Sequence, residues 1–183
     1  MSKLTEKRLS GEEIYSGSVL RLYRDEVQLP NGRTSHREYC LHIGAVAVLP
    51  LLSDGRVIVE RQFRYAHGRV FLEIPAGKLD TPEEDPLGAA RRELKEETGA
   101  EASSVTYLGE IHTTPALMNE KIHLYLAEGI SFGERSLDYD EFLDVELISL
   151  KELYSMVLNG EIRDAKTQIA VLKAAALRPE FIA

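Results

Sequence analysis

Three glutamates, Glu93, Glu96 and Glu97, stand three and four positions apart in one charged segment of the chain. In a helix, residues four apart lie about 40° from each other around the axis, so the carboxylates of Glu93 and Glu97 project side by side. Like charges placed in this way repel each other by roughly 0.2–0.5 kcal/mol when solvated, and by more near a buried sheet. A cation between them would relieve the repulsion.

Carboxylate oxygens favour magnesium, manganese or calcium over zinc or copper, and magnesium leaves coordination positions for water and for a substrate phosphate. The pair alone is also typical of a solvated helix face, because charged runs of this kind are common. The surrounding residues must therefore decide between a metal site and a surface.

The helix that carries the glutamates is marked at both ends. Asp85 can cap it, Pro86 suits the first helical position, and Gly99 can end it in the left-handed conformation. We predict a helix over 85–98 that packs onto a sheet through an apolar stripe. The stripe consists of Leu87, Ala90 and Leu94.

The other elements are expected to be short strands and two more helices. An Asn31-Gly32 turn lies inside a small antiparallel β unit over 14–42. A capping box at Ser149 opens a helix that ends near Gly160, and a last helix covers 165–177. The order favours an α/β or α+β sandwich over a regular βαβ array. The expected strands are 43–52, 56–64, 70–75, 105–112, 121–128 and 145–147, with a loop at 76–84.

Composition limits the class of protein. A length of 183 residues, 44% hydrophobic and 28% charged, fits one globular domain with a small appendage. The net charge of −8 opposes non-specific nucleic-acid binding, and no apolar stretch approaches a membrane span of about 18 residues. Cys40 is the only cysteine, as expected in a reducing compartment. We expect a cytoplasmic protein with neither a nucleic-acid nor a membrane partner.

The segment 77–100 resembles the signature of the Nudix hydrolase family, Gly-x5-Glu-x7-Arg-Glu-U-x-Glu-Glu-x-Gly-U, where U is aliphatic. Gly77 stands seven positions before Glu84 instead of six, so either the loop carries one extra residue or Glu83 takes the role of Glu84. We favour the extra residue, because a loop absorbs an insertion more easily than a helix. The positions that match in spacing are Glu84, Arg92, Glu93, Leu94, Glu96, Glu97, Gly99 and Ala100.

The resemblance implies a metal site and a fold. Glu93 and Glu97 would be the main ligands of Mg²⁺, for which Mn²⁺ could substitute. Glu96 would act as a further ligand and catalytic residue, directly or through water, and Ala76 would offer its backbone carbonyl. The implied fold is the family's α/β/α sandwich with a mixed sheet.

Structural support is implied for three other residues of the signature. Arg92 and Glu84 would form a pair that fixes the loop against the helix, and Gly77 would belong to that loop. We therefore assign them support rather than chemistry.

Further features are similar to the branch of the family that hydrolyses ADP-ribose and nucleotide sugars. Arg64 ends a Gln-aromatic-Arg element, and in that branch the arginine binds the diphosphate with its planar fork. Pro115 stands where that branch carries a marker proline, although Ala116 replaces the usual following glycine. Glu120 resembles an acidic residue that can reach the metals. Arg64 and Glu120 could also be ordinary surface charges.

The resemblance implies a general base in the acidic loop 134–144. We choose Glu141 by likeness to the branch and keep Asp140 in reserve; the alternative is a loop that is only solvated. The reaction would cut the pyrophosphate of a nucleoside diphosphate sugar such as ADP-ribose, giving a nucleoside monophosphate and a sugar phosphate.

Several alternatives stay open. The substrate could be another nucleotide sugar, such as GDP-mannose or ADP-glucose, and a non-catalytic sensor of nucleotide sugars is a different class. Acidity and the Pro115 region disfavour mRNA decapping or nucleotide sanitising. Members of the branch are usually homodimers, so residues 1–42 are expected to form a dimerising β region and residues 43–183 the hydrolase domain.

Overall fold

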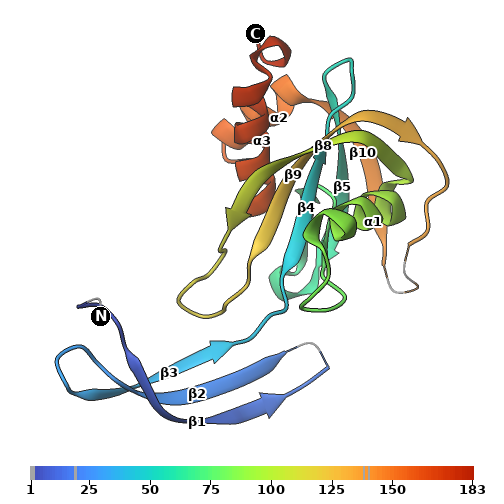
Figure 1. Cartoon of the computed structure of the whole chain (residues 1–183). Helices are drawn as coiled ribbons and strands as arrows, with labels where there is room; N and C mark the ends of the chain where they lie inside the picture. Colours follow the sequence, from blue (N-terminus) through green and yellow to red (C-terminus); the bar gives the residue numbers. More distant parts are fainter. Residues whose placement is uncertain (1–2, 19, 138, 140) are drawn as a thin grey trace. The chain divides into compact units, whose positions relative to one another are not determined.

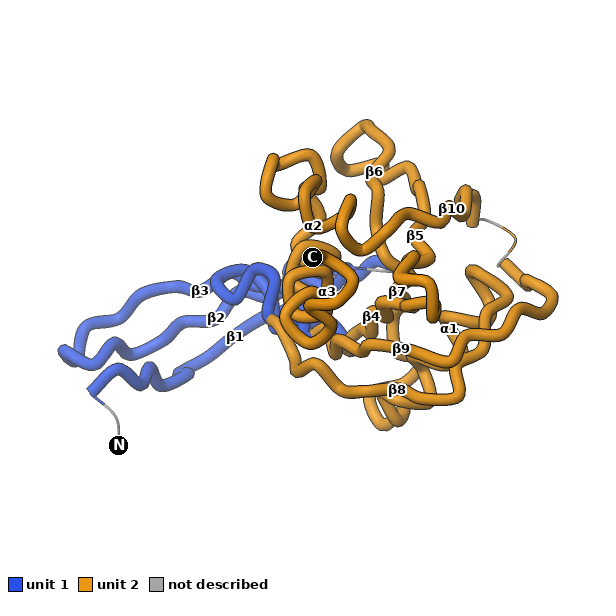
Figure 2. The backbone as a smooth tube through the Cα atoms, turned by 90° about the horizontal axis from the view of Figure 1, so that it is seen from above, with its two compact units in different colours: residues 1–43, 112–121 blue, residues 44–111, 122–183 orange. Residues whose placement is uncertain are grey.

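A computed structural model describes the whole chain except residues 1–2, 19, 138 and 140. The chain divides into two compact units: one contains residues 1–43 and 112–121, and the other contains residues 44–111 and 122–183 (Figure 2). The second unit carries the signature helix and most of the hydrophobic core.

Seven strands of the second unit form two sheets. One is a mixed sheet in the order β7-β4-β9-β8, in which β4 runs parallel to β9, and the other is antiparallel in the order β10-β5-β6. Their bounds are β4 Ala45–Pro50, β5 Arg56–Arg64, β6 Arg69–Glu73, β7 Ala76–Lys78, β8 Ala100–Ile111, β9 Ile122–Phe132 and β10 Leu143–Ser149.

Three helices cover this sheet arrangement from opposite sides, with α1 on one side and α2 and α3 on the other (Figure 1). The predicted α/β sandwich with a mixed sheet is confirmed. None of the helices within the described residues is long and apolar enough to cross a membrane. The helices are α1 Pro86–Thr98, α2 Leu150–Leu158 and α3 Ala165–Leu177, with 3₁₀ turns at Tyr65–His67 and Pro179–Phe181.

Strand β4 packs against helices on both of its faces. Its residues are all buried, and successive side chains point to opposite faces. Ala47 and Leu49 belong to the core beneath α2 and α3, whereas Val46 and Val48 belong to the core beneath α1. A strand that is apolar on both faces must be covered on both faces.

The predicted helix caps are confirmed. The carboxylate of Asp85 accepts a hydrogen bond from the Gly88 N–H at 2.9 Å, and Gly99 ends α1 with φ of 70°. Ser149 and Asp164 cap α2 and α3 in the same way. These bonds satisfy backbone N–H groups that the first helical turn leaves without partners.

The apolar stripe of α1 differs from the prediction in one residue. Ala90 and Leu94 are buried, but Leu87 is 37% exposed, and Ala89 is buried in its place. The buried stripe of the helix is centred on Glu93 and Glu97, so Leu87 falls at its edge.

One strand prediction was also incomplete. The expected loop 76–84 begins with strand β7, which pairs with β4; the pairing depends on a distant neighbour that local sequence does not specify. Strands β4 and β5 are joined by a turn in which the Gly55 N–H donates to Leu52 at 3.0 Å, and they belong to different sheets.

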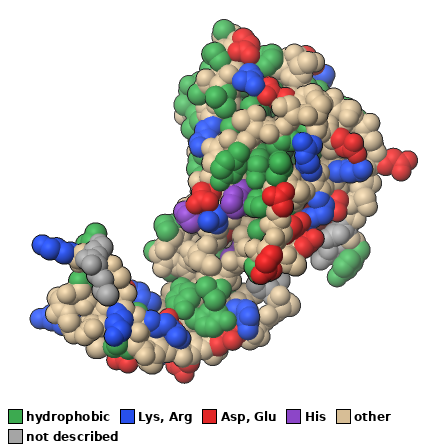
Figure 3. Space-filling view, viewed as in Figure 1, with side chains coloured by type: hydrophobic (Ala, Val, Ile, Leu, Met, Phe, Trp, Pro, Cys, Tyr) green, Lys and Arg blue, Asp and Glu red, His purple; other side chains and the backbone are tan. Residues whose placement is uncertain are grey.

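The first unit is built on a three-stranded antiparallel sheet in the order β1-β2-β3. It starts at Lys7, before the expected residue 14, and the Asn31-Gly32 turn lies between β2 and β3. Every residue of β1 is exposed, and apolar side chains lie on the surface of the molecule, as Figure 3 shows. The strands are β1 Lys7–Ser16, β2 Arg21–Gln28 and β3 Thr34–Cys40.

Candidate metal centre

Helix α1 turns two of its three signature glutamates inward. Glu93 is 8% exposed and Glu97 only 2%, whereas Glu96 is partly exposed. The alternative of a solvated helix face therefore does not hold for Glu93 and Glu97. Charged side chains are rarely buried to this extent unless they are paired or bind a cation.

Strand β7 lies against these two carboxylates. The backbone N–H of Ala76 donates to Glu97 Oε2 at 2.9 Å. The side chain of Glu93 lies so close to the backbone of Gly77 that a Cβ at that position would clash with its carboxylate. Ala76 thus lies beside Glu97, and Gly77 lies beside Glu93.

Arg92 forms hydrogen bonds with three glutamates of the signature. It donates to Glu84 at 3.4 Å, to Glu93 at 2.8 Å and to Glu96 at 3.1 Å. Glu84 also accepts a hydrogen bond from the Asp80 N–H at 2.5 Å, so one carboxylate joins the loop to the helix. Sequence reasoning assigned Arg92 only the contact with Glu84, because contacts within a helical turn depend on side-chain rotamers.

A further buried glutamate, Glu60 on β5, was not among the predicted site residues. It is fully buried, and neither of its carboxylate oxygens has a hydrogen-bond partner among the described residues. The only sequence signal was a charged residue at the end of the apolar run Val57-Ile58-Val59.

Burial and mutual repulsion make these acids hard to ionise. The pKa of Glu97 is raised to about 10, chiefly by burial and further by the negative charges of Glu60 and Glu93. The hydrogen bond from the Ala76 N–H acts in the opposite direction and lowers this pKa. Burial raises the pKa of Glu60 to about 8, partly offset by Lys166. Burial also raises the pKa of Glu93 to about 7, although Arg92 opposes the shift.

A divalent cation fits this arrangement in charge and in ligand chemistry. Glu60, Glu93 and Glu97 are buried carboxylates and so offer hard oxygen ligands, and Glu60 has no hydrogen-bonded partner among the described residues. Within the described part of the chain, however, no three His, Cys, Asp or Glu side chains already stand in a geometry that could hold a metal ion. The carboxylate of Glu93, now bonded to Arg92, would have to turn.

This electrostatic imbalance predicts how pH affects the protein without a divalent cation. The pKa values of Glu93, Glu60 and Glu97 are raised from 4.5 to about 7, 8 and 10, so folding favours their protonated forms. The protonated glutamates therefore contribute fully to the free energy of unfolding below about pH 4.5, and this contribution is lost as the pH rises towards 10. Urea unfolding in EDTA should show a falling free energy of unfolding over this range, and Mg²⁺ should reverse the loss near pH 8. A flat profile that Mg²⁺ leaves unchanged would contradict the expectation.

Arg64 lies at the end of β5 and pairs with Glu73 of β6. Its Nε and Nη2 donate to the two oxygens of Glu73 at 2.9 and 2.7 Å. Lys166 of α3, which sequence analysis missed, also contacts Glu73 and lies 3.1 Å from Asp164. Burial alone would raise the pKa of Glu73, but the hydrogen bonds from these two cations hold it below its usual value. These residues line a hollow of about 320 Å³.

Glu141 lies in the segment before β10 and lines a separate hollow of about 490 Å³ together with Arg61, Phe63 and Arg135. Its charge contributes to the raised pKa values of Glu60, Glu93 and Glu97. Glu141 is therefore within electrostatic reach of the acidic cluster. Asp140, the reserve choice for a base, lies outside the described residues.

Pro115 and Glu120 belong to the first unit, in the segment that packs with its N-terminal strands. Glu120 accepts a hydrogen bond from the hydroxyl of Thr113 and lies 3.9 Å from His42 Nε2. Their predicted contacts with substrate or metals thus remain predictions.

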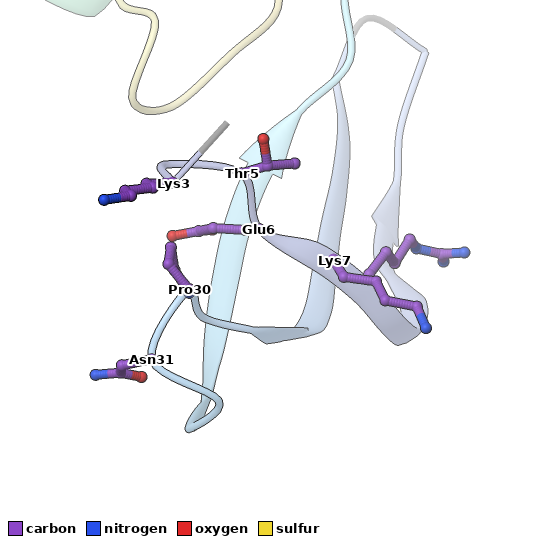
Figure 4. Close-up of a pocket in the computed structure, with 7 residues that line it drawn as sticks. Lys3, Thr5, Glu6, Lys7, Pro30 and Asn31 are labelled. Atoms are coloured by element: carbon purple, nitrogen blue, oxygen red, sulfur yellow. The ribbon is translucent and has the colours of Figure 1, made fainter. Parts of the chain in front are cut away.

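The first unit has a hollow of its own, with a volume of about 850 Å³ (Figure 4). All of its lining residues are exposed, so it lacks the desolvated charges found beneath α1. We assign no chemistry to it. The lining residues are Lys3, Thr5, Glu6, Lys7, Arg8, Pro30 and Asn31.

The chain is similar to known proteins over most of its length. A family model described as NUDIX domain matches residues 41–169, and one described as Nucleoside diphosphate sugar hydrolase N-terminal domain matches residues 6–39. The chain is 44% identical over 173 residues to an ADP-ribose pyrophosphatase of Bacillus subtilis (strain 168), with 93% of each chain covered.

Two further proteins are similar over nearly the whole chain. A Methanol dehydrogenase activator of Bacillus methanolicus is 43% identical over 174 residues, which cover 93% of this chain and 94% of the relative. The crystal structure of an ADP compounds hydrolase has a TM-score of 0.87 and covers 98% of this chain and 97% of its own. Its 21% sequence identity makes this a likeness of fold.

Proposed function

We propose that this chain, which belongs to the NUDIX family, hydrolyses the pyrophosphate bond of nucleoside diphosphate sugars such as ADP-ribose in the presence of Mg²⁺. The observation that carries the proposal is the burial of two carboxylates, Glu93 and Glu97, one turn apart on the signature helix. The 44% identity with an ADP-ribose pyrophosphatase supports the substrate class.

Glu93 and Glu97 would hold the cation, with Glu96 and the carbonyl of Ala76 as further ligands. When bound, Mg²⁺, or Mn²⁺ in its place, neutralises charge on the diphosphate and stabilises the leaving phosphate. Arg92 and Glu84 keep the loop and the helix together around these ligands.

Glu141 is the residue to which we assign the proton of the attacking water. The oxygen of that water would form a bond to phosphorus while the bridging P–O bond breaks and its electron pair stays on the leaving phosphate, and one proton of the water would pass to the Glu141 carboxylate. The products are a nucleoside monophosphate and a sugar phosphate, for example AMP and ribose 5-phosphate.

Arg64 would bind the diphosphate. Glu73 accepts from its Nε and Nη2 and so fixes the plane of the guanidinium; Nη1 is the nitrogen that we assign to phosphate oxygens. Pro115 and Glu120 are proposed to meet the substrate from the segment 112–121.

A panel of nucleotide sugars tests the proposal. ADP-ribose, ADP-glucose and GDP-mannose would be incubated with the protein and a phosphatase, with and without Mg²⁺, and released phosphate would be measured. We expect Mg²⁺-dependent release, highest with ADP-ribose. Binding of these compounds without release from any of them would favour the sensor class instead.

Gly77→Ala should disable the site while leaving the fold largely intact. The added Cβ would displace the Glu93 carboxylate, which is the flexible end of a side chain, so the backbone need not move. We expect kcat/KM for the best substrate to fall by about 10²-fold, a loss of the size that misplacement by 1 Å can cause. The thermal unfolding midpoint should change little. Gly88→Ala is a suitable control, because a Cβ there meets its nearest atom at 3.5 Å; equal losses in both variants would contradict the argument.

We further propose that the chain forms a homodimer through the N-terminal β region. Strand β1 is an edge strand, is exposed over its whole length and carries Leu9, Ile14 and Tyr15 on the surface. Exposed apolar edge strands tend to pair with another chain. Light scattering after size exclusion should give twice the chain mass, and Ile14→Glu should halve it. The single cysteine supports a cytoplasmic location.

A second candidate function is activation of another enzyme, which the 43% identical relative from Bacillus methanolicus bears in its name. Adding the protein to a methanol dehydrogenase and measuring methanol oxidation tests it. A faster rate with the native protein would support this role, and an unchanged rate would remove it.

A further inference from the structure

Glu60 lies on the side of β5 that faces helix α1. Side chains alternate along a strand, so Glu60 shares a face with Ile58, two residues earlier. Ile58 packs in the same core as Ala90 and Leu94 of α1. The carboxylate of Glu60 is therefore directed beneath the helix that carries Glu93 and Glu97, and it is fully buried there.

The neighbouring acid on the sheet shows what Glu60 lacks. Glu73 is the register partner of Glu60 on β6, and it is also buried, but it bonds to Arg64 and Lys166. Neither oxygen of Glu60 has a hydrogen-bond donor among the described residues. Of these two adjacent buried carboxylates, Glu73 thus receives hydrogen bonds from two cations, whereas Glu60 receives none among the described residues.

The groups around Glu60 separate into two sets. Lys166 and Arg64 act on it from the side of Glu73, to which both of them are bonded. Glu141 also acts on it, and Glu60 is in turn the charged group with the largest effect on Glu97. Among the charged groups, Glu60 thus acts most strongly on this proposed metal ligand of α1.

We propose that Glu60 is an additional carboxylate ligand of the divalent cation, reaching it from the sheet while Glu93 and Glu97 reach it from the helix. This inference rests on the proposed function. It explains why a charged residue stands in the core: a buried carboxylate is stable when it binds a cation and unfavourable when it stands alone.

Two variants test the proposal, Glu60→Gln and Glu60→Met, and Mn²⁺ is the probe. Free Mn²⁺ would be measured by electron paramagnetic resonance during titration of the full-length protein without substrate. We expect Mn²⁺ binding to weaken about tenfold or more in both variants, a loss of the size seen when residues around a metal are removed. We also expect both variants to unfold at a higher temperature than the native protein in EDTA, because the buried carboxyl group without a hydrogen-bond partner is gone.

Glu73→Gln is the matched control, since it removes the charge of the paired buried acid on the next strand. It should unfold at a lower temperature in EDTA, because Arg64 and Lys166 lose their partner. Native Mn²⁺ affinity in both Glu60 variants would overturn the proposal, as would a lower unfolding temperature for both in EDTA.

The Mn²⁺ titration tests the role of Glu60 independently of the proposed hydrolase activity. Mn²⁺ binding that is weakened in the Glu60 variants supports the ligand assignment even if the nucleotide-sugar panel shows no hydrolysis. Hydrolysis by the native protein, together with unchanged Mn²⁺ binding in the variants, would leave the proposed function standing and reject Glu60 alone.

Discussion

Glu97→Gln is expected to lower kcat for the best nucleotide sugar by roughly 10³-fold or more, on the scale of losing a main electrostatic group. Glu97 is buried, and glutamine keeps the shape of the side chain and an oxygen that can accept the bond from the Ala76 N–H. What it loses is the negative charge that would bind the cation. Steady-state kinetics across a range of Mg²⁺ concentrations would measure the effect.

The fold should survive this change, because the variant removes a charge that burial makes unfavourable. Its unfolding temperature in EDTA should match or exceed that of the native protein. Glu101→Gln, which alters an exposed glutamate paired with Lys95 just beyond α1, serves as the control. Unchanged turnover in Glu97→Gln would remove Glu97 from the metal site.

Glu141→Gln is expected to lower kcat by roughly 10²–10⁴-fold, the usual contribution of a general base. Because Glu141 would accept a proton only as the water attacks, metal affinity should fall much less than kcat. Mn²⁺ titration beside steady-state kinetics separates the two quantities.

Glu134→Gln, from the same acidic segment, is the control and should keep most of its activity. An unaffected kcat in Glu141→Gln would exclude Glu141 as the base and direct the search to Asp140 or Glu120. A parallel loss of Mn²⁺ affinity would instead make Glu141 a metal ligand.

Local sequence signals were sufficient for the helices and for the positions of the signature residues. The ends of α1 follow from Asp85 and Gly99, whose backbone chemistry allows few alternatives. The apolar run 43–52 predicts a strand, and the structure confirms it as β4.

Contacts between distant segments could not be predicted in this way. Glu60 reads as a single charge at the end of an apolar run, and only the pairing of β5 with β6 and its packing beneath α1 show that it is buried among acids. Lys166 reaches Glu73 across 93 positions of sequence. Strand β7 and the packing of residues 112–121 with the first unit also depend on partners far along the chain.

In the proposed function, the buried glutamates of α1 bind a divalent cation next to the diphosphate of the substrate. Anomalous scattering from crystals grown with Mn²⁺ and a non-hydrolysable methylene analogue of ADP-ribose would locate both. We predict a Mn²⁺ peak bounded by the carboxylates of Glu93 and Glu97, with the diphosphate of the analogue on its open side. A peak elsewhere, with Glu93 still bonded to Arg92 and the analogue away from α1, would rule out this metal site.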